Sequence, residues 1–173
     1  VTGGEPSITA PANQTVIEDN STAVLNFTID DGQTPAGSLV VSATSSNPAL
    51  VPNDAAHLVL GGTGQQRTVQ VVPAQNATGE VVVTLQVTDG DNNTNTSTFS
   101  VSISAVNDPP VVTVPPAQST GEDTPLVFSA ATGRTISVAD VDIATDQMQV
   151  TLTAGDGTVT LATTAGLTFD TGD

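Results

Sequence analysis

The chain has 173 residues, of which 37% are hydrophobic, and it contains four Phe but no Trp, Tyr or Cys. Eighteen Asp and Glu residues outnumber the two basic residues, Arg67 and Arg134, and the formal net charge is -16. This charge excludes nucleic-acid binding, because phosphates need a basic surface. The lack of Cys excludes disulfides, thiolate metal sites and cysteine catalysis. No stretch approaches the roughly 18 to 20 apolar residues that a membrane span needs.

Seven stretches carry the apolar and alternating patterns of β-strands. They cover residues 14–18, 24–29, 38–44, 57–60, 68–72, 80–88 and 98–106. Gly, Pro, Asn and Asp separate them at short intervals, and no helical period competes. Because the acidic residues lie between these strand patterns and form no long runs, a disordered acidic chain is rejected. We therefore predict an all-β fold, an Ig-like or cadherin-like Greek-key β-sandwich.

The stretch VSISAVNDPP, residues 101–110, marks the end of the first sandwich. It begins as a strand, and its two Pro residues then prevent further strand pairing. We predict an incoming linker over residues 1–8, a first sandwich over residues 9–108 and a second repeat over residues 109–173.

The second repeat begins as the first one does. Four positions recur at one constant offset, with Pro11, Gln14, Glu18 and Asp19 matching Pro115, Gln118, Glu122 and Asp123. This predicts a tandem repeat. Further strands are expected at residues 126–130, 149–153, 158–161 and 167–169, but the second copy has no counterpart of residues 80–88 and 98–106. We expect an incomplete sandwich that either borrows strands from a neighbouring chain or is held by contacts with the first domain.

Most carboxylates gather at predicted turns and strand ends. Ca²⁺ takes six to eight oxygen ligands in tolerant geometry, and two carboxylates spaced as Asp-x-Asp can address one ion. The alternative is that Asp, Asn and Gly simply favour turns, and it stays open for each single pair. The calcium interpretation is stronger where charges cluster at the hinge and would otherwise repel each other, as for Asn107, Asp108, Asp140 and Asp142.

The segment AVNDPP, the acidic pair that opens each copy and the Asp-x-Asp of the second copy are similar to cadherin-like and VCBS-type repeats of large bacterial surface proteins and adhesins. This resemblance implies Ca²⁺ at domain junctions, where it stiffens an extended rod. The ligands that it implies are Glu18, Asp89, Asn107, Asp108, Asp140 and Asp142. The linker has no Asp before its Asn-Asp pair, and no Asp-Arg-Glu motif occurs around Arg67, so we expect zero to two ions.

The expected function is that of a non-enzymatic extracellular module that spaces and stiffens a bacterial surface protein of the adhesin type. Its expected partners are neighbouring repeats, with a second copy through strand exchange and glycans as further candidates. The alternative is a carbohydrate-binding module or an accessory domain of a secreted polysaccharide-degrading enzyme, against which the missing aromatic platform argues. No catalytic residue is predicted. For His57, the only histidine, we expect a structural role without an acidic partner.

Overall fold

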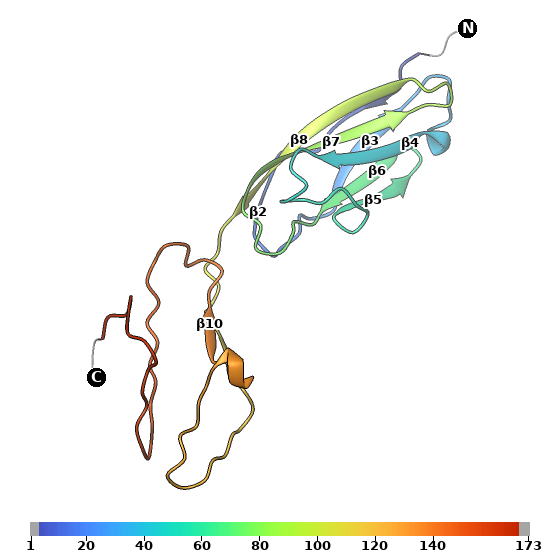
Figure 1. Ribbon diagram of the computed structural model, residues 1–173. Coiled ribbons are helices and arrows are strands. Elements are labelled where there is room, and N and C mark those ends of the chain that lie inside the picture. Colours follow the sequence, from blue (N-terminus) through green and yellow to red (C-terminus); the bar gives the residue numbers. More distant parts are fainter. Residues whose placement is uncertain (1–3, 170–173) are drawn as a thin grey trace. The chain divides into compact units, whose positions relative to one another are not determined.

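A computed structural model describes residues 4–169 of the chain. The chain forms two units, which are divided between Pro109 and Pro110. Each unit is described by itself below (Figure 1).

The first unit is a sandwich of two four-stranded sheets. One sheet has the order β1-β3-β6-β5, with bounds Ser7–Ile8, Leu25–Asp30, Gln66–Val71 and Leu58–Thr63. The other has the order β2-β8-β7-β4, with bounds Gln14–Ile17, Thr94–Ser104, Gly79–Thr88 and Val40–Ser45. A short 3₁₀ helix, η1, covers Ala36–Ser38.

Strand order identifies the fold of the first unit. β2 runs parallel to β8, and the other paired strands of the two sheets are antiparallel. In immunoglobulin lettering this is A-B-E-D on one sheet and G-F-C on the other, with the first strand divided between them as β1 and β2. The predicted all-β, Ig-like sandwich is therefore confirmed.

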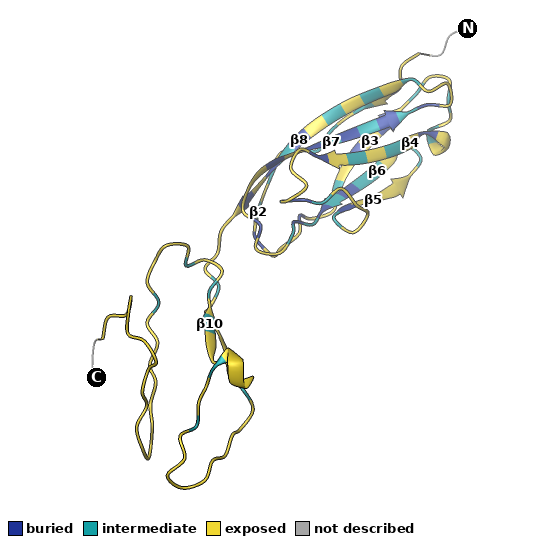
Figure 2. Cartoon of the chain, viewed as in Figure 1, coloured by how far each residue is buried: buried dark blue, intermediate teal, exposed yellow. Residues whose placement is uncertain are grey.

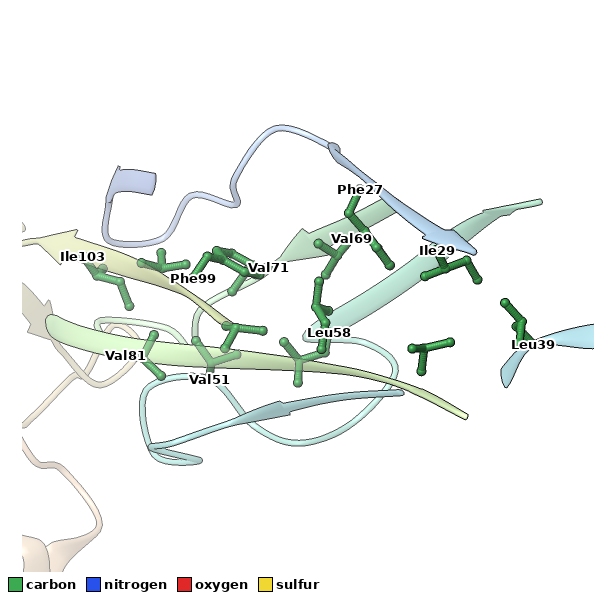
Figure 3. Close-up of a cluster of buried hydrophobic side chains, with 14 residues drawn as sticks. Phe27, Ile29, Leu39, Val51, Leu58, Val69, Val71, Val81, Phe99 and Ile103 are labelled. Carbon is green, nitrogen blue, oxygen red and sulfur yellow. The ribbon is translucent and has the colours of Figure 1, made fainter. Parts of the chain in front are cut away.

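The core lies between the two sheets (Figure 3). It forms because inward positions of each strand are apolar and successive side chains of a strand point to opposite faces. Fourteen buried apolar residues make up the central cluster. Half of them belong to β7 and β8, namely Val81, Val83, Leu85, Val87, Phe99, Val101 and Ile103. The hairpin of β7 and β8 is thus the main structural element of the unit.

Two elements of the first unit differ from the prediction. Ser7 and Ile8 were placed in a linker, but they form β1, because Ser7 pairs with Asp30 and Ile8 with Ile29 in β3. β5 was expected to end before its glycines, but it continues through them. Gly62 has φ +82, which only glycine adopts without strain, and an added Cβ there would lie 2.4 Å from the Gln66 carbonyl oxygen.

The second unit has little regular structure. β9, Val111–Thr113, pairs antiparallel with β10, Ser137–Ala139, and a 3₁₀ helix, η2, covers Ala130–Thr132. None of residues 110–169 is buried (Figure 2). The strands predicted at 126–130, 149–153, 158–161 and 167–169 are wrong for this structure, which places none of them in a strand. A strand pattern without a partner to pair with does not become a strand.

The beginnings of the two units nevertheless share local features, although residues 118–121 form no strand where Gln14–Ile17 form β2. The pairing of β9 with β10 repeats that of β1 with β3. Gln14 Nε2 donates to the carbonyls two and one residues before it, at 2.8 and 3.1 Å, and Gln118 Nε2 does the same at 2.8 and 3.3 Å. Asp19 and Asp123 both have positive φ, 59 and 55. These local features agree at the positions that the sequence matched, and the tandem repeat itself stays a prediction.

Candidate functional site

The β7–β8 hairpin defines two poles of the first unit. Gly79 pairs with Ile103 at one end of the hairpin, and Thr88 pairs with Thr94 at the other. We call the end at Ile103 the C-terminal pole and the end at Thr94 the N-terminal pole. A strand of this length separates the poles by about 30 Å, at roughly 3.4 Å per residue.

The C-terminal pole is built around Glu18, a residue that is only 4% exposed. β2 ends beside the last residue of β8, so the backbone N–H of Glu18 donates to the Ser104 carbonyl at 2.9 Å. Its Oε1 accepts a hydrogen bond of 2.6 Å from the backbone N–H of Val106. The carboxylate therefore ties the beginning of the linker to the end of β2.

Two further predicted residues lie in the linker that leaves this pole. Asn107 is exposed, and its Nδ2 donates to the Asp108 carbonyl oxygen at 2.8 Å. Asp108 is half-buried. Next to Glu18, Asp19 Oδ1 accepts from the Asn76 backbone N–H at 2.9 Å, so this carboxylate fastens a neighbouring loop.

Asp89 lies at the N-terminal pole and is buried. Its Oδ1 accepts from the backbone N–H groups of Asp91 at 2.9 Å and Asn93 at 2.8 Å, and its Oδ2 accepts from Asn93 Nδ2 at 2.8 Å. Asp89 thus caps the turn that joins β7 to β8. Because the hairpin separates it from Glu18, the two residues predicted as ligands of one kind of site cannot share an ion within this unit.

The predicted metal ligands do not assemble into one centre in either unit taken alone. Among residues 4–169, no group of three or more His, Asp or Glu side chains could hold a metal ion. In the second unit Asp140 Oδ1 accepts from the Asp142 backbone N–H at 2.9 Å, which is again a turn cap. Asn107 and Asp108 belong to the first unit and Asp140 and Asp142 to the second, so an ion shared by them stays a prediction.

Turn capping is the carboxylate role that sequence reasoning underestimated. Asp31 Oδ2 accepts from the backbone N–H groups of Gln33 and Thr34, and the Thr34 bond is the main reason that the pKa of Asp31 is lowered. Asp31 directly follows β3, as Asp140 directly follows β10. The sequence signal was present in both, since Asp after a strand commonly begins an Asx turn.

His57 has the acidic partner that we did not expect. Its Nδ1 lies 2.8 Å from Asp54 Oδ1, and this side-chain hydrogen bond is the main cause that lowers the pKa of Asp54. Asp54 Oδ1 also accepts from the backbone N–H groups of Ala56, at 2.9 Å, and His57, at 3.1 Å. The same carboxylate oxygen therefore caps the turn before β5 and orients the imidazole ring.

Arg67 is a structural residue of the first unit. Its Nε donates to the Gly64 carbonyl at 2.9 Å, and its Nη2 donates to the carbonyls of Ala36, at 3.0 Å, and Leu39, at 3.3 Å. It also lines a small pocket together with Phe27, Val41, Leu60 and two glycines of β5. No acid, nucleophile or histidine lines this pocket, so it offers no group for catalysis.

Neither a protein-family model nor a curated protein sequence matches the chain. Among solved structures, it is similar to the N-terminal Ig1-2 module of the Drosophila receptor protein tyrosine phosphatase DLAR, with 15% identity and a TM-score of 0.42. The match covers 64% of this chain and 56% of that one. The fold assignment rests on the strand order described above. Among residues 4–169, no helix is long and apolar enough to cross a membrane.

Proposed function

We propose that the chain is a non-enzymatic extracellular repeat module of a bacterial surface protein of the adhesin type, and that it spaces a distal domain from the cell. One observation carries the proposal: the chain passes through the first unit from end to end. It enters at the N-terminal pole, where the Pro6 carbonyl accepts from Asn95 Nδ2 at 2.9 Å, and it leaves at the C-terminal pole, beside Glu18.

This path suits a spacer. β8 has 11 residues, so each copy extends a tandem array by about 35 Å, at roughly 3.4 Å per residue. The Glu18 contact holds the direction in which the linker leaves, and Pro109 and Pro110 restrict the backbone that follows. Stacked repeats of this kind gain length in proportion to their number.

Calcium is a separable part of the proposal. It is supported by the net charge of -16, since closely spaced carboxylates repel unless cations bind or screen them. The proposed oxygen ligands are Glu18, Asn107, Asp108, Asp140 and Asp142. Asp89 would serve the opposite pole of its unit, because it lies beside Thr94 and not beside Ile103.

Tandem arrays of residues 1–109 test the spacer. We expect small-angle scattering from arrays of one, two and four copies to show a maximum dimension that grows by about 35 Å per copy. A dimension that grows much less, as in a compact cluster, would contradict an extended spacer. Binding of the same arrays to polysaccharides in a glycan pull-down would favour a carbohydrate-binding module instead.

A further inference from the structure

The pocket at Arg67 is formed by a row of three paired residues in the first unit. Phe27 in β3 lies opposite Arg67 in β6, and Arg67 lies opposite Gly62 in β5. Residues paired in this way share one face of a sheet, and Phe27 belongs to the core cluster, so all three positions face the interior of the sandwich. Because Gly62 has no side chain, the row leaves a cavity of about 200 Å³ beside Arg67. Val41 and Leu60 add apolar side chains to its wall.

Arg67 brings a positive charge to this cavity without a negative partner. It is half-buried, and among residues 4–169 no carboxylate forms an ion pair with its guanidinium group. Asp30, the last residue of β3, accepts a hydrogen bond from Gln65 Nε2 at 2.7 Å. A half-buried charge held only by neutral carbonyls still attracts an anion, because the protein interior screens it less than water does.

One nitrogen of the guanidinium group is available for a ligand. The hydrogen bonds of Arg67 within residues 4–169 use only Nε and Nη2. No buried side-chain nitrogen or oxygen of these residues lacks a partner, so Nη1, which has none, is accessible to solvent. The guanidinium group can therefore donate to an anion while its bonds to the carbonyls of Ala36 and Leu39 stay in place.

We infer that this cavity binds a small monocarboxylate with an apolar body. The carboxylate accepts from Arg67 Nη1, and the apolar body lies against Phe27 and Leu60. A guanidinium group fits both carboxylates and phosphates, but the other side chains of the wall offer no donor for further phosphate oxygens. A chain of net charge -16 also repels a dianion more than a monoanion.

The size of the cavity limits the ligand. It is smaller than the roughly 300 to 1,000 Å³ of sites for drug-sized ligands, so the apolar body is a single ring or a short branched chain. This inference is independent of the spacer proposal and of calcium.

Benzoate added to the full chain tests the site, with an NMR titration that follows the backbone amide of each residue. We expect the amide signals of Gly61 and Gly62 to move and to saturate with benzoate, while those of residues 110–169 stay unchanged. Sodium chloride at equal ionic strength is the control for screening. Benzamide has the same ring without the charge and should bind about tenfold more weakly, since charged hydrogen bonds are stronger than neutral ones.

A pair of Trp variants locates the bound benzoate. Leu60→Trp fills the cavity and should abolish the saturable shifts, while Arg67 keeps the contacts that hold its neighbours. Val59→Trp is the matched control. Val59 is exposed to a similar extent, 39% against 36% for Leu60, but it lies on the opposite face of β5. This variant should bind benzoate as the parent does.

Three outcomes would overturn the inference. The first is that the signals of Gly61 and Gly62 do not move in benzoate, or move equally in sodium chloride. The second is equal affinity for benzamide, which would show that the cavity does not recognise the charge. The third is undiminished binding by Leu60→Trp, which would place the benzoate elsewhere on the chain.

Discussion

Glu18 Oε1 accepts a hydrogen bond of 2.6 Å from the backbone N–H of Val106, so a buried carboxylate directly after β2 holds the first residues of the linker. The contact exists because β2 runs parallel to β8 and ends where β8 ends. Glu18, which the sequence suggested as a metal ligand, thus accepts a hydrogen bond from the chain's own backbone. Its counterpart Glu122 keeps the turn but lies exposed.

Glu18→Ala should reduce the free energy of unfolding of the first unit. We expect a loss of about 1.5 to 3 kcal/mol, the range for hydrogen bonds to charged groups. Denaturation in urea, followed by far-ultraviolet circular dichroism, measures it. Glu5→Ala is the matched control, since it removes the same charge from an exposed position and should change stability by less than about 0.5 kcal/mol. Equal effects of the two substitutions would show that the Val106 contact contributes nothing.

Leucine truncation should destabilise the first unit much more than the second. Leu85 is fully buried in β7, and Leu85→Ala should cost about 2 to 5 kcal/mol, because it leaves a cavity between the sheets. Leu152 is 52% exposed, so Leu152→Ala should change stability by less than about 0.5 kcal/mol. Thermal and urea unfolding of the full chain compare the two. A large loss from Leu152→Ala would mean that the second unit has a core in solution without a partner.

Much of the first unit could be predicted from the sequence, because a period-two apolar pattern is a strong signal for strands of five or more residues. β1 could not be predicted, since its two residues form a strand only by pairing with β3. The second unit shows the reverse: residues 149–153 have a strand pattern, but the structure does not place them in a strand. Strand formation depends on the partner as well as on the pattern.

The site was harder to predict than the fold. That Asp89 lies far from Asn107 follows already from the predicted hairpin, because the residue after β7 is at the hairpin tip and the residue after β8 is at the other end. The roles of the carboxylates did not follow from composition. The structure was needed to show that Asp31 and Asp89 cap turns, because only it shows that backbone N–H groups of their own turns donate to these carboxylates.

Gly62→Ala should destabilise the β5–β6 hairpin. The substitution places a Cβ 2.4 Å from the Gln66 carbonyl oxygen in a backbone with φ +82, so the two strands must move apart. We expect a loss of at least about 1 to 3 kcal/mol. Gly37→Ala is the control, because Gly37 has no positive φ and no atom within 4 Å of the added Cβ. Thermal unfolding measures both variants. If Gly62→Ala and Gly37→Ala unfold at the same temperature, the prediction that the added Cβ at Gly62 clashes with β6 is wrong.

Stability should fall in acid through Asp31 and Asp54. The Thr34 backbone N–H lowers the pKa of Asp31, and the hydrogen bond with His57 lowers the pKa of Asp54. A pKa below its unfolded value, about 3.9, means that the folded state binds fewer protons, so the contribution is present above that pH and is lost as the pH falls through the folded pKa. Urea midpoints between pH 7 and pH 2.5 measure this. Asp31→Asn keeps an acceptor for the turn and should lose less stability over that range. Identical pH profiles for the variant and the parent would contradict the assignment.

Calcium binding predicts a gain in thermal stability that monovalent salt does not reproduce. If the sites have the affinity of extracellular calcium modules, with Kd of about 0.1 to 1 mM, then 10 mM Ca²⁺ should raise the free energy of unfolding by about 1.4 to 2.7 kcal/mol. Sodium chloride at equal ionic strength gives the contribution of screening alone. Asp108→Ala should remove the extra gain, whereas Asp146→Ala, an equal loss of charge, should retain it. Equal melting temperatures in Ca²⁺, in sodium chloride and in chelator would reject calcium binding. The proposed spacer function would still stand, since the end-to-end path of the chain through the first unit depends on β8 and not on any ion.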